Sequence, residues 1–299
     1  MGAAAQPASY TLTLPDDLAY SFFKHRVKKL AGNDLSASKS TQMRRRLGSL
    51  LARSKAANLV EYAKMLEQPD RLREFLDFFT INVSEFFRIP DRFEYLANHL
   101  LPDLLARRGE MRVWSAGCSN GAEPYSLAML LDEIAPRGRW SILATDVDRT
   151  ILARAQRGDG YTEADLRNVS PGRLALYFER DGSGYRVKES LRRRVRFQAH
   201  DLLKDPFQAG FRLVVCRHVL IYFTEEAKES LIRQLIESME EGGILFVGGT
   251  EIIPRCWEFG LEQVAVSFYR KPAGAPAYLV PGAPHGCGAS GAYGGWQGR

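Results

Sequence analysis

Residues Val113–Pro124 read VWSAGCSNGAEP, an apolar run that passes into a series of small residues. The run is typical of a buried strand, and residues 125–134 continue as a predicted helix. Glycine is needed where a turn is tight or where a ligand approaches the backbone too closely for a Cβ atom. Because open α/β sheets bind ligands at the carboxyl ends of their strands, we expect the loop at Gly117 to contact a small molecule.

The spacing of the glycines disfavours a phosphate-bearing cofactor. Gly117 and Gly121 form a Gly-x-x-x-Gly pattern, without the Gly-x-Gly-x-x-Gly of dinucleotide sites, and no Gly-Lys-Ser/Thr follows. S-adenosylmethionine carries no phosphate, so carboxylates are compatible with its site. Asp146 closes the next predicted strand, 29 residues beyond Gly117, where an acid can accept both ribose hydroxyls. Glu123 stands at the start of the predicted helix.

Each acid also has a structural interpretation. Asp146 could cap the helix predicted over 147–157, and Glu123 could complement a helix dipole from the first turn. The order of strand, loop, helix, strand and acid favours the cofactor site.

After Gly109, short β-rich runs alternate with helical segments, which predicts a parallel sheet built from βαβ units. An insertion over about 158–190 contains a predicted hairpin at 178–185. The predicted strands cover residues 112–116, 141–145, 195–199, 211–216, 243–247 and 263–269.

The pattern divides the chain into four further parts. We expect a flexible N-terminus over 1–15, amphipathic helices over 16–89, the α/β domain over 90–270 with a connecting helix at 90–107, and a disordered tail over 271–299. The apolar face of the first helix is predicted to include Leu18, Phe22, Phe23 and Val27. The tail holds eight Gly, four Pro and six Ala in 29 residues, a composition that cannot form a packed core.

Positive charge gathers near the N-terminus. Ten Lys or Arg residues lie between Lys24 and Lys55, and Asp34 is the one acid among them. A solvated helix face explains many such runs. The adjacent Arg44, Arg45 and Arg46 repel one another, however, so we expect a surface that binds an acidic partner.

Several classes of protein are disfavoured. No run reaches the roughly 18 to 20 apolar residues of a membrane span, so no insertion into a membrane is expected. Residues 1–10 lack the basic start and apolar core of an export signal, which favours a cytoplasmic location. The four cysteines are far apart and form no Cys-x-x-Cys pair, so neither a metal site nor a disulfide framework is expected.

Across about residues 16–270 the sequence resembles the chemotaxis-receptor glutamate methyltransferases, the CheR family. The resemblance rests on five motifs in order: NVSEFFR at 82–88, the block 113–125, ATDVD at 144–148, HDLL at 200–203 and VCRHVLIYF at 215–223. It implies an α/β fold, a Rossmann-like S-adenosylmethionine-dependent methyltransferase domain with a small inserted antiparallel β-subdomain, preceded by a small all-α domain.

The resemblance also implies roles for individual residues. Arg88 and Tyr222 would face the reacting centre. The residues around the cofactor would be Asn82, Ser84, Arg88, Glu123, Asp146, Asp201, Leu202, Arg217 and His218. From the residues alone, Tyr222 could equally be a core aromatic, and Asn82 with Ser84 a helix cap.

Five positions depart from the family pattern. Ser84 stands where Thr is usual, Asp201 and His218 stand where Asn is common, and Gly249-Thr250-Glu251 replaces His-Ser-Glu. His218 exchanges an amide for a ring with an ordinary pKa of about 6.5, so it could carry a charge beside the cationic sulfonium.

The activity implied is methyl ester formation on receptor glutamates in sensory adaptation, with S-adenosylhomocysteine as the product. The partner would be the acidic helical bundle of a methyl-accepting chemotaxis receptor, bound by a monomer through Arg44, Arg45 and Arg46.

One alternative is a methyltransferase for nucleic acid or for another protein, which uses the basic helices for binding. Enzymes that methylate base amino groups carry an Asn/Asp-Pro-Pro-Tyr-like tetrapeptide where Arg217-His218-Val219-Leu220 stands here, so nucleic acid is not the expected partner. A second alternative is a non-catalytic scaffold that binds the cofactor and could dispense with Arg88 and Tyr222.

Overall fold

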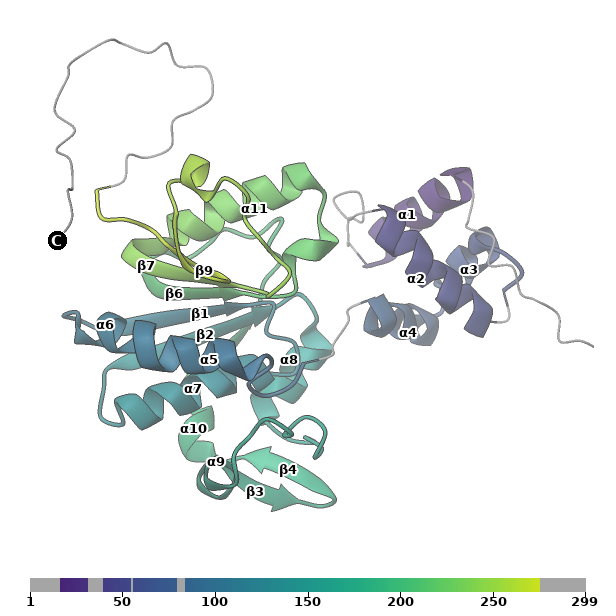
Figure 1. Cartoon of the computed structure of the whole chain (residues 1–299). Coiled ribbons are helices and arrows are strands. Elements are labelled where there is room, and N and C mark those ends of the chain that lie inside the picture. The colour runs from purple at the N-terminus through teal and green to yellow at the C-terminus, as the bar shows by residue number, and fades with distance from the viewer. Residues whose placement is uncertain (1–16, 32–39, 55, 80–83, 275–299) are drawn as a thin grey trace, which may run out of the picture.

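The computed structural model describes residues 17–31, 40–54, 56–79 and 84–274. Four helices come first in the chain (Figure 1). They are α1 (Asp17–Ala31), α2 (Ser40–Arg53), α3 (Leu59–Met65) and α4 (Pro69–Phe79). Their shared core includes Phe23, Leu47, Tyr62 and Phe75. This is the predicted small all-α unit.

The predicted apolar face of α1 was partly wrong. Leu18 and Phe22 are 84% and 40% exposed, whereas Tyr20, Phe23 and Val27 are buried. Tyr20, Phe23 and Val27 lie at i, i+3 and i+7, which places them on one face of the helix. Phe22 lies one position before Phe23 and is therefore outside that face.

The connecting helix runs without a break but changes its winding. It consists of α5 (Pro90–Tyr95), a π-helical turn (Leu96–Leu100) and α6 (Leu101–Ala106). Pro102 has no N–H, so an ordinary helical bond to the carbonyl of Asn98 cannot form there. The N–H of Leu101 instead reaches back five residues to the Leu96 carbonyl, which is the π pattern.

Seven strands form the main sheet in the order β5-β2-β1-β6-β7-β9-β8. The first five are parallel, and β9 runs antiparallel to both its neighbours. The strands are β1 (Met111–Ala116), β2 (Trp140–Asp146), β5 (Val195–Ala199), β6 (Phe211–Cys216), β7 (Met239–Val247), β8 (Glu262–Ala265) and β9 (Phe268–Arg270).

The last predicted strand was wrong as a single element. Residues 263–269 fold back on themselves as the hairpin of β8 and β9. The turn lies at Val266 and Ser267, where Ser267 has a φ of 75°. A residue in this left-handed region allows the chain to reverse. Residues 263–269 contain no glycine, so the sequence did not indicate a turn there.

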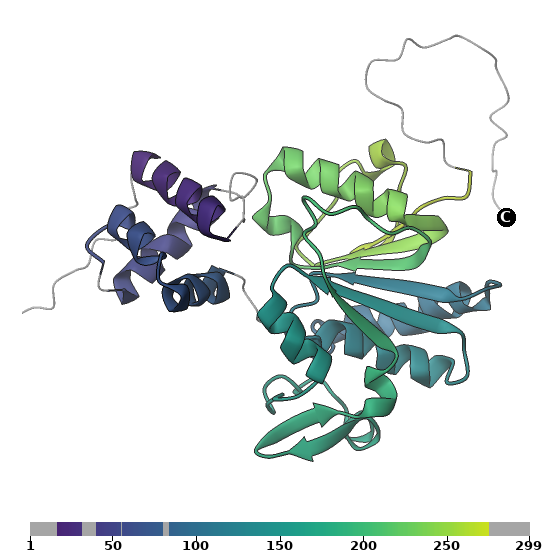
Figure 2. The same ribbon diagram turned by 180° about the vertical axis from the view of Figure 1, so that it is seen from behind.

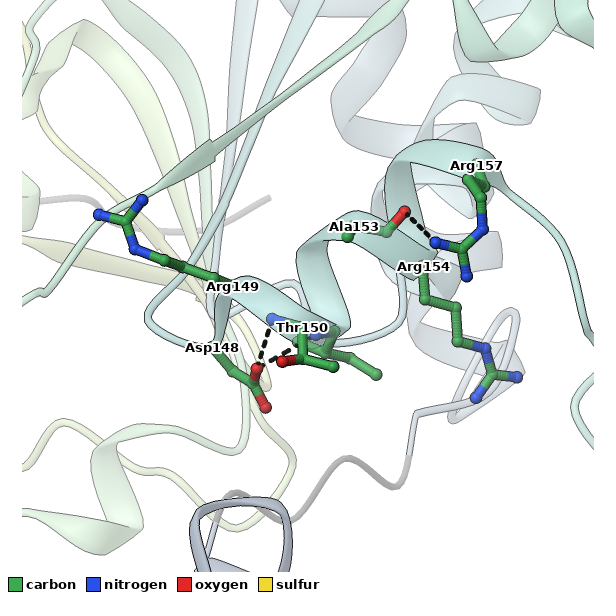
Figure 3. Close-up of a pocket in the computed structure, with 7 residues that line it drawn as sticks. Asp148, Arg149, Thr150, Ala153, Arg154 and Arg157 are labelled. Atoms are coloured by element: carbon green, nitrogen blue, oxygen red, sulfur yellow. Dashed lines mark hydrogen bonds between the residues drawn. The ribbon is translucent and has the colours of Figure 1, made fainter. Parts of the chain in front are cut away.

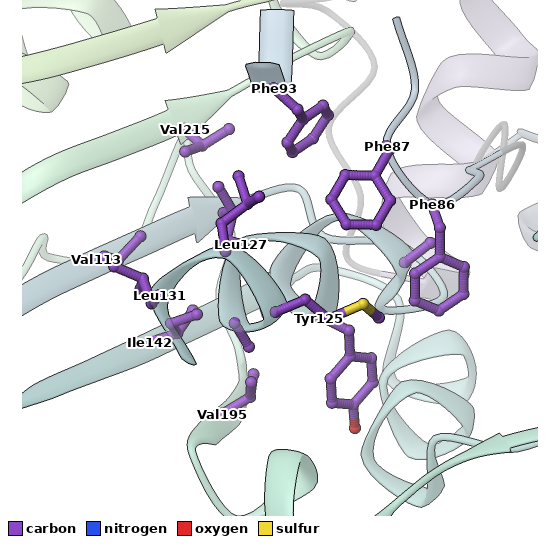
Figure 4. Close-up of a cluster of buried hydrophobic side chains, with 14 of the residues drawn as sticks. Phe86, Phe87, Phe93, Val113, Tyr125, Leu127, Leu131, Ile142, Val195 and Val215 are labelled. Carbon is purple, nitrogen blue, oxygen red and sulfur yellow. The ribbon is translucent and has the colours of Figure 1, made fainter. Parts of the chain in front are cut away.

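Helices cover both faces of the sheet, and two hydrophobic cores result. On one face lie α5, α6, α7 (Ala122–Ile134) and α8 (Arg149–Arg157); α11 (Glu225–Ser238) lies on the other, as Figures 1 and 2 show from opposite sides. Val113 and Val215 point to the first core, with Leu127 and Leu131 of α7 (Figure 4), whereas Trp114 packs in the second. Alternate residues of one strand thus reach opposite faces, and both are apolar because both faces are covered.

The insertion after α8 contains α9 (Pro171–Tyr177), a two-stranded sheet and the short α10 (Glu189–Arg192). The strands β3 (Phe178–Asp181) and β4 (Gly184–Val187) pair antiparallel, as the hairpin prediction required. This is the small antiparallel sheet expected between the second and third strands of the main sheet.

Three sequence predictions concern segments outside the described residues: the flexible start 1–15, most of the tail 271–299, and Asn82. The domain boundaries at 16, 90 and 270 stay predictions. Within the described ranges, we find no helix of the length and apolar character that crossing a membrane demands.

Candidate active site

The loop between β1 and α7 leaves no space for a side chain at Gly117. Gly117 has a φ of +82°, and a Cβ atom built there would lie 2.5 Å from Cγ2 of Val219. The N–H groups of Gly117 and Cys118 both donate to the carbonyl oxygen of Thr145, at 2.8 and 2.9 Å. The loop is therefore held between the end of β2 and the segment after β6, at the carboxyl edge of the sheet.

Asp146, the last residue of β2, binds this loop and does not cap a helix. Its Oδ2 accepts the N–H of Ser119 at 2.8 Å, and its Oδ1 accepts the N–H of Asp148 at 3.0 Å. The helix cap is Asp148, whose Oδ1 accepts the N–H groups of Thr150 and Ile151. Burial raises the pKa of Asp146, and the backbone N–H donors oppose that rise. A carboxylate has about four acceptor positions, so Asp146 can accept from a ligand hydroxyl as well as from the backbone.

Glu123 and Arg217 form a buried pair across the same edge. The Nη1 of Arg217 lies 3.3 Å from Oε2 of Glu123, and the hydroxyl of Ser115 donates to Oε1 at 2.8 Å. The Arg217 side chain is only 2% exposed. Burial raises the pKa of Glu123 and lowers that of Arg217, while each partner stabilises the charged form of the other.

Arg217 has two further contacts that connect it to the segment before α5. Its Nη2 donates to the carbonyl oxygen of Arg88 at 2.6 Å. Its guanidinium also lies over the rings of Phe93 and Phe246, at 5.1 and 4.6 Å from the ring centroids. The backbone of Arg88 is thus attached to the loop after β6.

Residues 84–88 are bonded to the start of α7. Asn120 donates from Nδ2 to the carbonyl oxygen of Ser84 at 3.3 Å, and the N–H of Phe87 donates to Oγ of Ser126 at 2.9 Å. Phe87 has a φ of 51°, in the left-handed region. These bonds hold the segment of Ser84 and Arg88 beside the loop between β1 and α7, which Asp146 binds.

The insertion holds the same segment from the other side. The ring of Phe86 packs edge-on against Tyr161 and Phe178, with centroids 4.8 and 5.1 Å apart. The guanidinium of Arg173 lies 4.4 Å from the Phe87 centroid and forms a two-pronged ion pair with Glu133 of α7, with both bonds 2.8 Å long. The insertion is therefore part of the wall that positions Arg88.

His218 follows Arg217 in a left-handed conformation, with a φ of 61°. Burial, then Arg88, then Arg217 lower its pKa to about 4, below the ordinary 6.5 that the sequence suggested. The imidazole is therefore neutral at pH 7. Its Nε2 is buried and has no hydrogen-bond partner among the described residues.

Glu251 is a residue of this edge that the sequence interpretation missed. Its Oε2 accepts the N–H groups of His218 and Gly248, and its Oε1 accepts that of Ile221. Its only signal in the sequence was its place in the triplet 249–251, where Glu251 matches the last residue of the family's His-Ser-Glu and Gly249 and Thr250 differ. A backbone-binding role has no signature in residue type.

The remaining predicted residues lie on neighbouring segments. Tyr222 ends the 3-10 helix Leu220–Tyr222 in the loop after β6. Asp201 follows β5, where its Oδ1 accepts the N–H of Leu203 and its Oδ2 pairs with Lys204 at 3.0 Å. Leu202 is buried in the second core.

The three arginines of α2 differ in their surroundings. Arg44 forms an ion pair with Asp17 and lies over the ring of Tyr20, 4.4 Å from its centroid. Arg45 is exposed. The side chain of Arg46 lies outside the described part of the structure. Of the three arginines predicted to bind a partner, Arg44 thus contacts residues of the helical domain itself.

A pocket lies along α8 and begins at Asp148, whose N–H is bonded to Asp146. It is lined by residues 148–151, 153, 154 and 157, and Figure 3 shows the side chains of Arg149, Arg154 and Arg157 pointing in different directions. None of the residues predicted to bind the cofactor lines it, so we assign no role to it in the reaction.

The donor set of the edge fits S-adenosylmethionine. The tight turn at Gly117 allows backbone contact, Asp146 offers acceptors for a ribose, and the orphaned Nε2 of His218 and the Nε of Arg217 are buried polar atoms that a polar ligand can satisfy. The seven-stranded sheet of this order, with Asp146 at the end of β2, is the arrangement that the resemblance to S-adenosylmethionine-dependent methyltransferases implied.

Comparison with known proteins identifies the family. Residues 18–80 match the family model "CheR methyltransferase, all-alpha domain", and residues 82–264 match "CheR methyltransferase, SAM binding domain". The chain belongs to the CheR methyltransferase family.

Curated relatives agree with this assignment. A chemotaxis protein methyltransferase of Listeria monocytogenes is 41% identical over 86% of this chain and 99% of the relative. Chemotaxis protein methyltransferase 1 of Pseudomonas aeruginosa is 35% identical over 78% of this chain and 90% of the relative. The solved glycopeptide N-methyltransferase MtfA with sinefungin is 14% identical over 55% of this chain and 50% of that chain, at a TM-score of 0.35, a likeness too low to support any conclusion.

Asp146→Asn should weaken S-adenosylmethionine binding by about 1.5 to 3 kcal/mol, or roughly ten- to a hundredfold, because hydrogen bonds to a charged acceptor are lost. Titration calorimetry measures the change. The matched control is Asp148→Ala, which should lower helix stability by about 1 kcal/mol through loss of the cap and leave the affinity intact. Equal affinity in Asp146→Asn and wild type would refute the ribose role.

S-adenosylmethionine affinity should not vary with His218 between pH 8 and about 5, because the imidazole is neutral throughout that range. As the pH falls toward 4, protonation adds a positive charge beside Arg88, Arg217 and the ligand's sulfonium, so affinity should fall. His218→Asn should lack this acid-side loss. Affinity is measured across pH, with circular dichroism to exclude unfolding. A transition near pH 6.5 that disappears in His218→Asn would contradict the lowered pKa.

Proposed function

We propose that this protein transfers a methyl group from S-adenosylmethionine to glutamate side chains on the cytoplasmic domain of chemotaxis receptors. The products would be a glutamate methyl ester and S-adenosylhomocysteine. The observation that carries the proposal is the bond from Arg217 to the Arg88 carbonyl, which joins the segment of Arg88 to the loop of Tyr222. Membership of the CheR family and the relatives' name, chemotaxis protein methyltransferase, support the receptor as the substrate.

The chemistry requires positioning and no proton transfer. A glutamate with a pKa of ~4.3 is already ionised at neutral pH, so the acceptor needs no general base. Bound S-adenosylmethionine supplies an electrophilic methyl group on a sulfonium. Arg88 would hold one oxygen of the acceptor carboxylate by charge-assisted hydrogen bonds, and the hydroxyl of Tyr222 would orient the other.

The neutrality of His218 fits this chemistry. A charged imidazolium would repel the sulfonium, whereas the neutral ring adds no positive charge to a site that already holds Arg88 and Arg217. Asp146 and Glu123 would provide the negative charge that a cationic ligand requires.

Receptor binding would use the basic face of α1 and α2, in the cytoplasm, with the protein acting as a monomer. Because Arg44 is paired with Asp17, the exposed Arg45 is the better candidate for contact with an acidic receptor helix. No metal is required for this transfer.

The direct test is incubation with labelled S-adenosylmethionine and a receptor cytoplasmic fragment. Ester label is released by mild alkali, whereas label on an amine is stable. Duplex DNA and structured RNA serve as competing acceptors. Label on nucleic acid and none on the receptor would overturn the proposal in favour of the nucleic-acid alternative.

Tyr222→Phe should lower kcat while S-adenosylmethionine affinity stays nearly constant, since the hydroxyl is assigned to the acceptor and the ring still packs. The measurement is turnover on the receptor fragment beside calorimetric affinity. If affinity fell as far as kcat, Tyr222 would be a structural residue.

Arg45→Glu should raise the Michaelis constant for the receptor without changing that for S-adenosylmethionine, and added salt should weaken the wild type more than the variant. The control is Arg108→Glu, which makes the same charge change at an exposed position. Arg108 lies just before β1, at the amino ends of the parallel strands, whereas the candidate site lies at their carboxyl ends. If Arg45→Glu and Arg108→Glu gave the same Michaelis constant for the receptor, the exposed charge of α2 would have no role in receptor binding.

A further inference from the structure

The loop after β6 carries Arg217, His218 and Tyr222, yet its own backbone has little regular structure to hold it. His218 is left-handed, and Leu220–Tyr222 is a single 3-10 turn. A loop with few internal hydrogen bonds can hold side chains accurately only when another group binds its backbone.

Glu251 is that group. Its Oε2 accepts the N–H of His218 at 2.6 Å and the N–H of Gly248 at 2.8 Å, and its Oε1 accepts the N–H of Ile221 at 3.2 Å. The residue is 5% exposed. One carboxylate thus binds the loop at two places, at His218 and directly before Tyr222.

The topology explains why residue 251 reaches this loop. β6 and β7 are neighbours, and Cys216 is paired with Val247 at their ends. Both chains leave the sheet at the same edge. The N–H of Glu251 donates to the carbonyl oxygen of Gly248 at 2.9 Å, a tight turn that directs the carboxylate back toward β6.

Gly248 makes the space for this arrangement. A Cβ atom at Gly248 would lie 2.5 Å from Oε2 of Glu251 and 3.0 Å from the backbone nitrogen of His218. A side chain at Gly248 and the carboxylate cannot both occupy their places. The two residues therefore act together.

The buried charge of Glu251 is compensated by the donors it binds. N–H groups donate to both of its oxygens, which favours the ionised form although burial raises its pKa. The charge also acts on Arg217, whose guanidinium it helps to keep protonated. The Glu251 carboxylate therefore interacts with three residues of the loop. It accepts hydrogen bonds from the backbone of His218 and Ile221, and its charge stabilises the guanidinium of Arg217.

We propose that Glu251 is a positioning residue for methyl transfer, which holds His218 at the cofactor and Tyr222 at the acceptor by binding the backbone of their loop. The Tyr222 half rests on the proposed function, whereas the His218 half requires only cofactor binding. Glu251 would touch neither substrate.

The test compares Glu251→Gln and Gly248→Ala with the control Gly249→Ala. Glutamine keeps one acceptor oxygen and turns an amide donor toward backbone donors. In Gly248→Ala the added methyl group would displace the Glu251 carboxylate from the N–H of His218. The substitution causes no backbone strain, because Gly248 has no positive φ. A Cβ at Gly249 would meet only the end of the Ile89 side chain, at 3.3 Å.

Both test variants should lower kcat on the receptor fragment by about ten- to a hundredfold, the loss expected from misplacing a reacting group by about 1 Å. Both should also weaken S-adenosylhomocysteine binding, measured by calorimetry, while Gly249→Ala leaves kcat and affinity at wild-type values. The melting temperature is recorded for each, and Gly248→Ala serves if Glu251→Gln does not fold.

A lower melting temperature with wild-type kcat and affinity would overturn the proposal, because Glu251 would then only stabilise the ends of β6 and β7. If the wild type does not methylate the receptor, the proposed function fails on its own. The affinity measurement still decides whether Glu251 positions His218, and unchanged affinity would overturn that half as well.

Discussion

The arrangement of the active edge depends on one buried guanidinium, that of Arg217. It pairs with Glu123 at the start of α7, donates to the carbonyl of Arg88 before α5, and lies over Phe93 of α5 and Phe246 of β7. A buried charge is costly to leave unpaired, so each of these segments must stay in place for the others to be stable. A buried ion pair need not add to the free energy of unfolding. It does favour one specific arrangement, because the planar guanidinium can donate only to partners in certain positions.

Shortage of space is the second constraint, and glycines resolve it. Gly117 lies against Val219, and Gly248 lies against Glu251 and His218, so the loops after β1, β6 and β7 approach one another without side chains between them. Close approach of three loops lets backbone groups and a few side chains surround a ligand. A methyl group added at Gly117 would press on Val219, and one added at Gly248 would press on Glu251 and on the backbone of His218.

The insertion contributes to the site as well as to the outer surface. Phe86 packs between Tyr161 and Phe178, and the hydroxyl of Tyr161 donates to the carbonyl of Asn120 at 2.7 Å. Asn120 in turn binds the backbone of Ser84. The segment before Arg88 thus has contacts with both the β-subdomain and the loop before α7.

The sequence by itself determined the features that depend on local pattern. Apolar runs alternating with helices specified the parallel strands, the loop at Gly117 and the hairpin of β3 and β4, and motif order specified the family. Two local predictions were wrong because no residue type marks the feature: the turn at Ser267, which lacks a glycine, and the phase of α1, where Tyr20 is buried in place of Phe22. The sequence left open whether Asp146 binds the cofactor or caps a helix, and the structure gives the cap to Asp148.

The tertiary structure alone decided how distant residues act on one another. Glu123 and Arg217 are 94 positions apart, and their pairing exists only because β1 and β6 are neighbours in the sheet. The pKa of His218 depends on burial and on two arginines brought beside it, so an ordinary histidine in the sequence is a neutral one in the fold. The role of Glu251 was invisible for the same reason: its partners are backbone N–H groups, which every residue but proline carries, and only the folded chain selects which of them it binds.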